Sequence, residues 1–114
     1  FKTQADYSHH PQLAPMQRIS GKEAYMRYVE ATLPFLRESG GDITLIGQCD
    51  RFFIGPADEH WDLAMIIKQR SLNDFLAFAS NPSYLEILGH RVAALEDSRL
   101  LPIEALAPNE TPVT

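Results

Sequence analysis

The run from Asp62 to Lys68 constrains the fold more than any other part of the chain. Successive side chains of an extended strand point to opposite faces of its sheet. Both sets are apolar in this run: Leu63, Met65 and Ile67 share one face, and Ala64 and Ile66 share the other. A strand of this kind is typical of the centre of a sheet that is covered on both sides. The run therefore predicts a central strand whose two faces both need cover.

A long helix is predicted to begin after Ser20. Ser20 and Glu23 have the spacing of a capping box, in which the two side chains satisfy free amides at a helix start. Pro34 predicts a kink or a break, because its ring crowds the carbonyl of the preceding turn. Gly40-Gly41 predicts a left-handed stop. Between these signals the apolar residues recur every three or four positions: Tyr25, Tyr28, Val29, Thr32, Leu33 and Leu36.

Two shorter helices are predicted after the central strand. Ser71 caps the first, which runs through Phe75, Leu76 and Phe78. Asn81-Pro82 starts the second, with proline at the first helical position. The second helix carries one apolar stripe, which we expect to lie on the sheet: Tyr84, Leu85, Leu88, Val92 and Leu95.

Further strands are predicted on either side of these helices. One runs from Ile43 to Gln48 and continues extended over residues 51–54, and the last runs from Arg99 to Ile103. Phe1-Lys2, where the chain begins without methionine, has the character of the end of a strand. The order strand, helix, strand, strand, helix, strand is the split βαβ pattern of a ferredoxin-like α+β domain with an antiparallel sheet. We expect this domain over residues 1–103, with a long loop over 3–19 and a flexible tail over 104–114.

One face of such a sheet is left open, because both helices of a ferredoxin-like domain lie on the other face. The open face is apolar here, and monomers rarely expose an apolar patch of that size. A second copy that packs sheet against sheet is the simplest cover. We therefore predict a homodimer.

Composition limits the classes of partner. The chain has 114 residues, and its ten Lys and Arg against fifteen Asp and Glu give a net charge of −5. This charge attracts neither nucleic acid nor an anionic membrane. No apolar run approaches the roughly 20 residues that span a bilayer, and we expect a cytoplasmic protein.

Several short motifs follow one another in a fixed order along residues 1–103. They are Gly21-x-x-Ala24-Tyr25-x-x-Tyr28, Gly40-Gly41, Ile54-Gly55-Pro56-x-Asp58-Glu59-x-Trp61-Asp62, Asn81-Pro82-x-Tyr84, His90-Arg91 and Asp97-Ser98-Arg99. Together they resemble the domain-of-unknown-function family thirteen-thirty. The resemblance implies the dimeric α+β barrel superfamily, in which two ferredoxin-like protomers enclose a pocket with their sheets. It also implies a full first strand ahead of Phe1, and no established activity, substrate or cofactor.

The turn before the central strand holds the first candidate catalytic residues, His60 and Asp62. A histidine beside carboxylates suits a general base near neutral pH, because a carboxylate holds and orients the histidine proton. The alternative is a solvated acidic turn, Asp58-Glu59-His60-Trp61-Asp62, in which Trp61 packs as a lid on the core.

His90 and Arg91 form the second candidate pair. We expect His90 on the side of its helix away from the apolar stripe, facing solvent or a partner subunit. Arg91 can make a two-pronged bond to Asp97 or Asp62, or it can hold a substrate carboxylate in the pocket. The candidate ligand-binding residues are Arg91, Trp61, Tyr25, Tyr28 and Asp97, and the candidate catalytic residues are His60, His90 and Asp62.

No metal or cofactor is expected. The histidines and Asp62 lack the local spacing of a metal site. Cys49, the only cysteine, follows an apolar strand without a neighbouring base, which predicts a packed and unreactive thiol.

Hypotheses of three kinds remain open. The first is an uncharacterised homodimeric domain that binds a small, partly apolar ligand between sheet and helices. The second is a cofactor-independent enzyme, an isomerase or a monooxygenase-like protein, that acts on a small aromatic or enol acid. It requires His60 or His90 within hydrogen-bond reach of Asp62 or Asp97, facing a cavity. The third is a purely structural interaction module.

Overall fold

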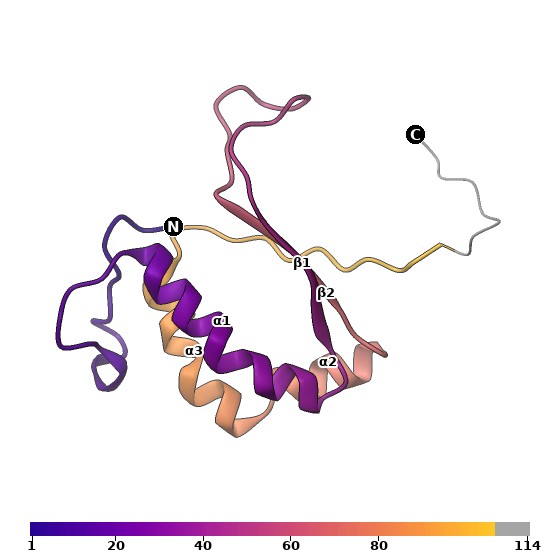
Figure 1. Cartoon of the computed structure of the whole chain (residues 1–114), viewed down its shortest axis with the longest axis horizontal. Coiled ribbons are helices and arrows are strands. Elements are labelled where there is room, and N and C mark those ends of the chain that lie inside the picture. The colour runs from indigo at the N-terminus through magenta and orange to yellow at the C-terminus, as the bar shows by residue number, and fades with distance from the viewer. Residues whose placement is uncertain (107–114) are drawn as a thin grey trace.

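The first helix begins and ends where its capping signals predict. In the computed structural model, which describes residues 1–106, α1 spans Gly21–Glu38 (Figure 1). The Oγ atom of Ser20 accepts a hydrogen bond from the amide of Glu23 at 3.0 Å. Gly40 adopts a φ of 97°, the left-handed conformation that ends a helix. These two local contacts fix the length of α1.

Pro34 does not break α1, so the break is excluded from the two outcomes that the sequence predicted, a kink or a break. The helix continues through Pro34 to Glu38 as one element. Pro34 and Glu30 both lie on the exposed side of the helix. Water can therefore satisfy the carbonyl of Glu30 that proline leaves without an amide partner.

The two later helices are α2, Leu72–Ala79, and α3, Pro82–Ala94. Ser71 Oγ accepts a hydrogen bond from the amide of Asp74 at 3.1 Å, and Asn81 Oδ1 accepts one from the amide of Ser83 at 2.9 Å. Both predicted starts are confirmed by these caps.

The stripe of α3 that turns inward matches the predicted one only in part, because Tyr84, Leu88 and Leu95 pack against the core clusters. Leu85 and Val92 are 50% and 43% exposed, so the prediction that they face the sheet is wrong. The small size of the buried residues explains the difference, because it lets α1 and the loop over residues 3–19 approach the α3 backbone closely. The residues that α3 buries are Tyr84, Gly89, Ala93 and Ala94.

The described sheet consists of two antiparallel strands, β1 (Asp42–Gln48) and β2 (Leu63–Lys68). Leu63 and Met65 pack against the helices. Leu45 and Ile66 are paired across the strands and are 60% and 49% exposed. The strand prediction for β2 is confirmed, but only one face of the described sheet is covered.

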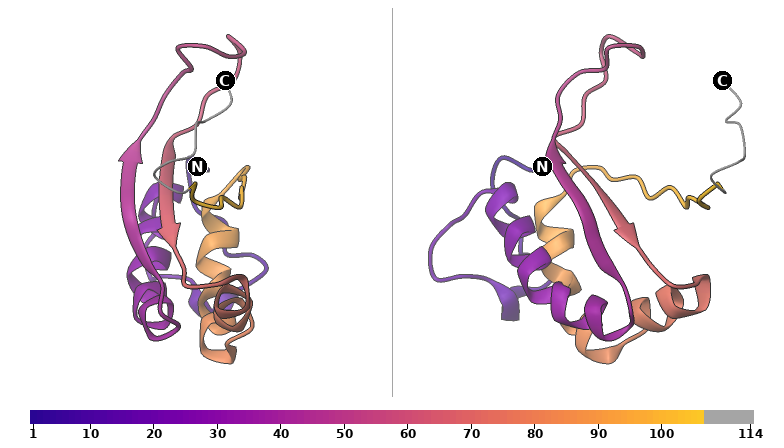
Figure 2. Two further views of the ribbon diagram at one scale, coloured as in Figure 1. Left: turned by 90° about the vertical axis from the view of Figure 1, so that its right-hand side faces the viewer. Right: turned by 45° about the vertical axis from the view of Figure 1, so that its right-hand side comes forward.

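Two predicted extensions of the sheet are absent from residues 1–106. Residues 52–54 lie outside the ladder, and an isolated bridge joins Arg51 to His60. The segment 99–103 is not a strand, because it runs away from α3 without a strand beside it to share hydrogen bonds (Figures 1 and 2). The predicted tail over residues 104–114 falls mainly on 107–114, outside the described residues.

The start of the chain is tied to the helices rather than to a strand. The amide of Lys2 donates to the carbonyl of Ala94 at 2.8 Å, and the amide of Gly21 donates to the carbonyl of Lys2 at 3.0 Å. Residues 3–19 form the predicted loop, with one short 3₁₀ helix, η1, at Pro11–Leu13. The loop folds back over α3, where Gly89 leaves room for the side chains of His10 and Leu13.

Two apolar clusters make up the core between the helices and the inner face of the sheet. The first contains Tyr7, Ala24, Tyr25, Ala93 and Ala94, and the second contains Leu36, Phe78 and Tyr84. Among residues 1–106, no helix is long and apolar enough to cross a membrane.

Substituting Gly21 by alanine tests the close approach at the start of α1. An added Cβ lies 2.2 Å from the carbonyl oxygen of Lys2 and 2.7 Å from that of Ala94, so backbone has to move. We expect Gly21→Ala to lower the free energy of unfolding by about 1–3 kcal/mol, measured by urea denaturation. Gly47→Ala is the matched control, because nothing lies within 4 Å of its added Cβ. Equal stability of the two variants contradicts the packing described.

Candidate functional site

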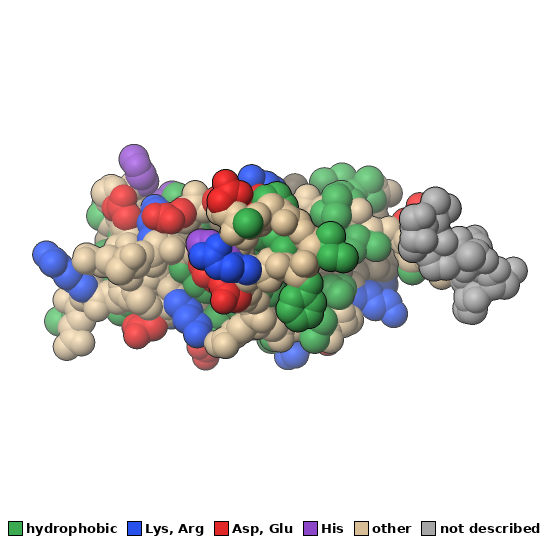
Figure 3. Space-filling model, turned by 90° about the horizontal axis from the view of Figure 1, so that it is seen from above, with side chains coloured by type: hydrophobic (Ala, Val, Ile, Leu, Met, Phe, Trp, Pro, Cys, Tyr) green, Lys and Arg blue, Asp and Glu red, His purple; other side chains and the backbone are tan. Residues whose placement is uncertain are grey.

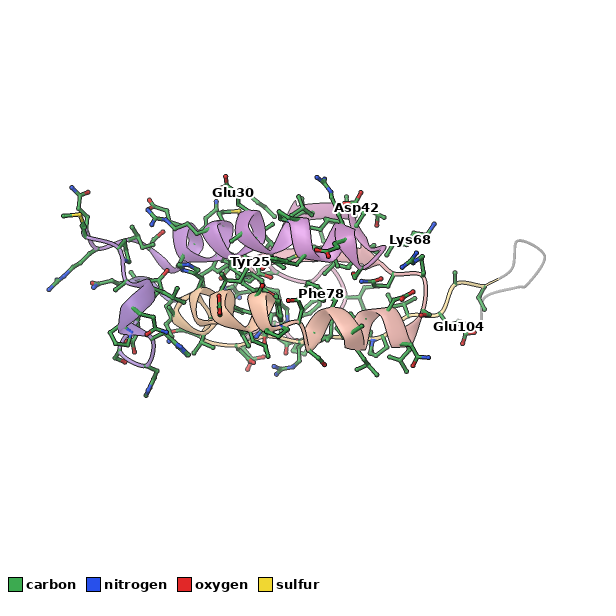
Figure 4. All side chains as sticks on the ribbon, turned by 90° about the horizontal axis from the view of Figure 1, so that it is seen from below. Tyr25, Glu30, Asp42, Lys68, Phe78 and Glu104 are labelled. Carbon is green, nitrogen blue, oxygen red and sulfur yellow. The ribbon has the colours of Figure 1, made fainter. Side chains whose placement is uncertain are left out.

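Three tyrosines form a continuous cluster between α1 and α3, which we name the tyrosine seam: Tyr25, Tyr28 and Tyr84. The hydroxyls of Tyr28 and Tyr84 share a hydrogen bond of 2.8 Å, and the rings of Tyr25 and Tyr28 lie 5.4 Å apart. Figure 4 shows Tyr25 pointing into the space between the two helices, whereas Glu30 points outward from α1. Burial raises the pKa of Tyr25 and Tyr28 above the ordinary value, and for Tyr28 the hydrogen bond to Tyr84 adds to the shift. The hydroxyls of Tyr25 and Tyr28 therefore stay protonated at neutral pH.

Arg91 projects from α3 close enough to the tyrosine seam for its charge to act on Tyr25 and Tyr28, opposing the effect of burial on their pKa values. The side chain is half-buried, and its Nη2 donates to the Oγ of Ser98 at 3.0 Å. Arg91 is bonded to neither Asp97 nor Asp62, the partners that the sequence suggested. Within residues 1–106 the guanidinium has no carboxylate partner, so most of its donors are available.

His90 lies on another side of α3 and is bonded to the loop. Its Nδ1 shares a hydrogen bond of 2.8 Å with the hydroxyl of Tyr7, and the two rings meet edge to face. The expectation that His90 faces solvent or a partner is wrong, because the loop over residues 3–19 folds across this side of the helix. Burial lowers the pKa of His90, and the charge of Arg27 adds to the effect. Neutral imidazole is therefore the form that the fold accommodates.

His60 and Asp62 lie at the base of the turn between β1 and β2. The Nε2 atom of His60 is 3.9 Å from Oδ1 of Asp62, too far for a hydrogen bond, and both side chains are about half exposed. The nitrogen of Phe1 donates to Oδ2 of Asp62 at 2.7 Å, and this contact lowers the pKa of the carboxyl. The described residues thus contain no hydrogen-bonded pair of His60 or His90 with Asp62 or Asp97.

Trp61 and Asp97 are connected through Arg99. The guanidinium of Arg99 lies 5.0 Å from the centre of the Trp61 ring, a cation–π contact. Arg99 also pairs with Asp97, and its hydrogen bond is the main cause that lowers the pKa of Asp97. Asp97 therefore pairs with Arg99, and the Trp61 ring lies against the Arg99 guanidinium.

The structure thus divides the predicted site residues into three groups. Tyr25, Tyr28 and Arg91 come together at the tyrosine seam, and His90 is instead bonded to Tyr7 of the loop. The third group surrounds the base of the β1–β2 turn: His60, Trp61, Asp62 and Asp97. Three contacting residues were not assigned as partners from the sequence, because no local spacing signals such contacts: Tyr7, Tyr84 and Ser98.

The surface of residues 1–106 is hollowed in at least two places, both shallow. The first, of about 360 Å³, lies between the start of α1 and the ends of the strands and is lined by Phe1, Lys22, Gln48, Cys49, Asp62 and Leu63. The second, of about 190 Å³, lies within the loop over residues 3–19. Cys49 is exposed at the first recess, so the prediction of a packed thiol is wrong. The strand ends at Gln48, one residue before the cysteine, and the residues on both sides of Cys49 are exposed as well. No cluster of three potential metal ligands occurs in the described part of the chain.

The fold and the site define a small mixed α+β domain, with helices on one face of an antiparallel pair of strands and a tyrosine and arginine cluster beneath it. The crystal structure of methylated RPA0582 is similar over 96% of this chain and 76% of that chain, with 34% identity and a TM-score of 0.81. A second structure of RPA0582, a protein of unknown function from Rhodopseudomonas palustris, matches 94% of this chain and 76% of that chain, with 34% identity and a TM-score of 0.77. The chain belongs to the family of RPA0582. No protein-family model matches the chain, and no curated protein does.

The contact between His90 and Tyr7 predicts a stability that depends on pH. Because the folded protein holds the pKa of His90 below its ordinary value of 6.5, the unfolded chain binds the proton more readily. The contribution of His90 is complete above that value and is lost as the pH falls through it toward the folded pKa. We expect the free energy of unfolding to fall less between about pH 7.5 and pH 5 in His90→Asn than in the wild type.

The control for this measurement is His60→Asn, which replaces a histidine that is 56% exposed. It should keep the wild-type dependence. A wild-type slope that persists in His90→Asn shows that another group causes it.

Proposed function

We propose that the chain is one protomer of a homodimeric, ferredoxin-like domain of the dimeric α+β barrel kind, and that it binds a small, partly apolar acid between its sheet and its helices. The observation that carries the proposal is the half-buried Arg91, without a carboxylate partner in residues 1–106, beside the tyrosine seam. We also propose that the chain is a member of the domain-of-unknown-function family thirteen-thirty, which its motifs resemble.

The chemistry of the seam supports an acid as the ligand. The guanidinium of Arg91 can present two parallel N–H groups to a carboxylate, which is the geometry that arginine binds best. Tyr25 and Tyr28 supply aromatic surface and protonated hydroxyls, and they add no negative charge that would repel the ligand. Leu63 and Met65 of β2 pack against the same cluster as Tyr25 and supply the apolar wall.

The shape of the chain supports the homodimer. Its radius of gyration is 16.2 Å, against about 13 Å for a compact domain of this length. Its Cα extents are 53 × 38 × 17 Å, so the chain is elongated and flat. The uncovered face of that sheet presents Leu45 and Ile66 to water. A second copy provides cover of the same apolar character.

The binding domain is better supported than the enzyme. His90 is engaged by Tyr7, and His60 stands in solvent 3.9 Å from Asp62. A general base needs a partner that holds and orients its proton, and neither histidine is hydrogen-bonded to Asp62 or Asp97.

Ile66→Lys tests the homodimer. A lysine on the open face places a charge where the proposal buries an apolar side chain, so it should weaken association by at least tenfold, measured by equilibrium sedimentation. Leu72→Lys is the control, because Leu72 is 70% exposed on α2 rather than on the sheet. The homodimer is refuted by a wild-type protein that sediments as a monomer at micromolar concentration.

Arg91→Ala tests the ligand site. Phenylacetate, a small aromatic acid, should raise the melting temperature of the wild type and leave that of Arg91→Ala unchanged, because a ligand stabilises the folded state only through its contacts. Arg37→Ala removes an exposed arginine on α1 that pairs with Asp42, and it should keep the wild-type response. An equal rise in wild type and Arg91→Ala excludes the carboxylate contact.

A further inference from the structure

The β1–β2 hairpin continues beyond the sheet as an ordered projection, which we name the hairpin tip, residues 49–62. The amide of Cys49 donates to the carbonyl of Asp62 at 2.9 Å, and the amide of Trp61 donates to the carbonyl of Asp50 at 3.1 Å. Figures 1 and 2 show the hairpin tip rising beyond the helices on every view. The tip therefore stands away from both apolar clusters of its own chain.

Local contacts close the apex of the hairpin tip. The Nη1 atom of Arg51 donates to the carbonyl of Ala57 at 2.8 Å and closes the turn. Gly55 has a φ of +157° and leaves room for the ring of Phe52, whose Cγ lies 2.7 Å from the position of a Cβ at residue 55. Phe52 thus packs on its own turn. A side chain held in place before contact loses less conformational freedom when it binds.

Phe53 and Ile54 project from this ordered apex into water, with relative exposures of 107% and 95%. Scattered exposed apolar residues need no explanation, but two large adjacent ones at the apex of a projecting hairpin have the character of an interface anchor. Asp50, Asp58 and Glu59 flank the apex. These carboxylates disfavour an anionic membrane as the surface that receives it.

The exposed area of the chain indicates a second copy as the partner. The chain exposes 8882 Å², whereas a folded monomer of 12.8 kDa exposes about 6,300 Å². The excess of about 2,600 Å² has the size that each partner buries in a large obligate homodimer. Figure 3 shows the molecule from above, and apolar side chains gather in one region of this surface. Charged side chains lie mainly toward the N-terminal loop. An apolar patch can be buried against the same patch of a second copy, because both surfaces are apolar.

We propose that Phe53 and Ile54 insert into a second copy of this chain and anchor the homodimer, with each copy giving one hairpin tip and receiving another. This inference rests on the proposed homodimer and adds the residues on which its affinity depends. In this arrangement the hairpin tip extends beyond the open face of its own sheet and contacts the second copy. Because the contact is made twice around a twofold axis, its loss counts twice in the affinity.

The double variant Phe53→Ser, Ile54→Ser of the full chain tests the inference by equilibrium sedimentation. We expect its dimer dissociation constant to exceed that of the wild type at least 100-fold. Met16→Ser is the matched control, because Met16 is 105% exposed on the loop over residues 3–19 and should leave the constant unchanged. Circular dichroism and the urea midpoint at low concentration report whether each variant folds. If the serine variant does not fold, Phe53→Leu with Ile54→Ala takes its place, with a smaller expected rise of at least tenfold.

The outcomes separate this inference from the homodimer itself. If the tip variant dimerises as tightly as the wild type while Ile66→Lys dissociates, the homodimer stands and the anchor is overturned. If the wild type is monomeric, the homodimer and the anchor both fall. The anchor is also overturned if the hairpin tip binds a different protein while the affinity between copies stays unchanged.

Discussion

The close contact of α1 with α3 is the constraint on which the rest of the structure depends. Ala24, Ala93 and Ala94 are each fully buried where the helices meet, and they let the two backbones approach. Gly21 lets Lys2 pass beside both helix ends and bond to each of them. A larger side chain at any of these positions pushes the helices apart, because packed interiors have no room for an added group.

The same contact decides what remains uncovered. With both helices side by side on the inner face of the hairpin, that face receives the tyrosine seam, and Arg91 is placed next to it. No described element remains to cover the outer face of the sheet, so Leu45 and Ile66 stay exposed. The binding site and the interface that we propose are therefore two consequences of one helix arrangement.

Local signals in the sequence were sufficient to predict where the helices begin, but they could not predict contacts between residues far apart in the chain. Ser20, Ser71 and Asn81 cap their helices as predicted, because a cap involves atoms only two or three residues away. The contact of Tyr7 with His90 joins residues 83 apart, and periodicity on α3 carries no sign of the loop that covers it. The strand predicted at residues 99–103 failed for a related reason, since apolar alternation indicates a strand but does not supply its hydrogen-bonding partner.

Small-angle X-ray scattering over a series of protein concentrations tests the central claim most directly, because it reports mass and shape together. An assembly of two flat protomers should scatter with twice the mass of 12.8 kDa and with one unchanging curve from low to high micromolar concentration. Its longest distance should also stay well below twice the 53 Å length of the protomer, since sheets packed face to face overlap along their length. A curve that gives a mass of 12.8 kDa and a radius of gyration near 16.2 Å at every concentration contradicts the account.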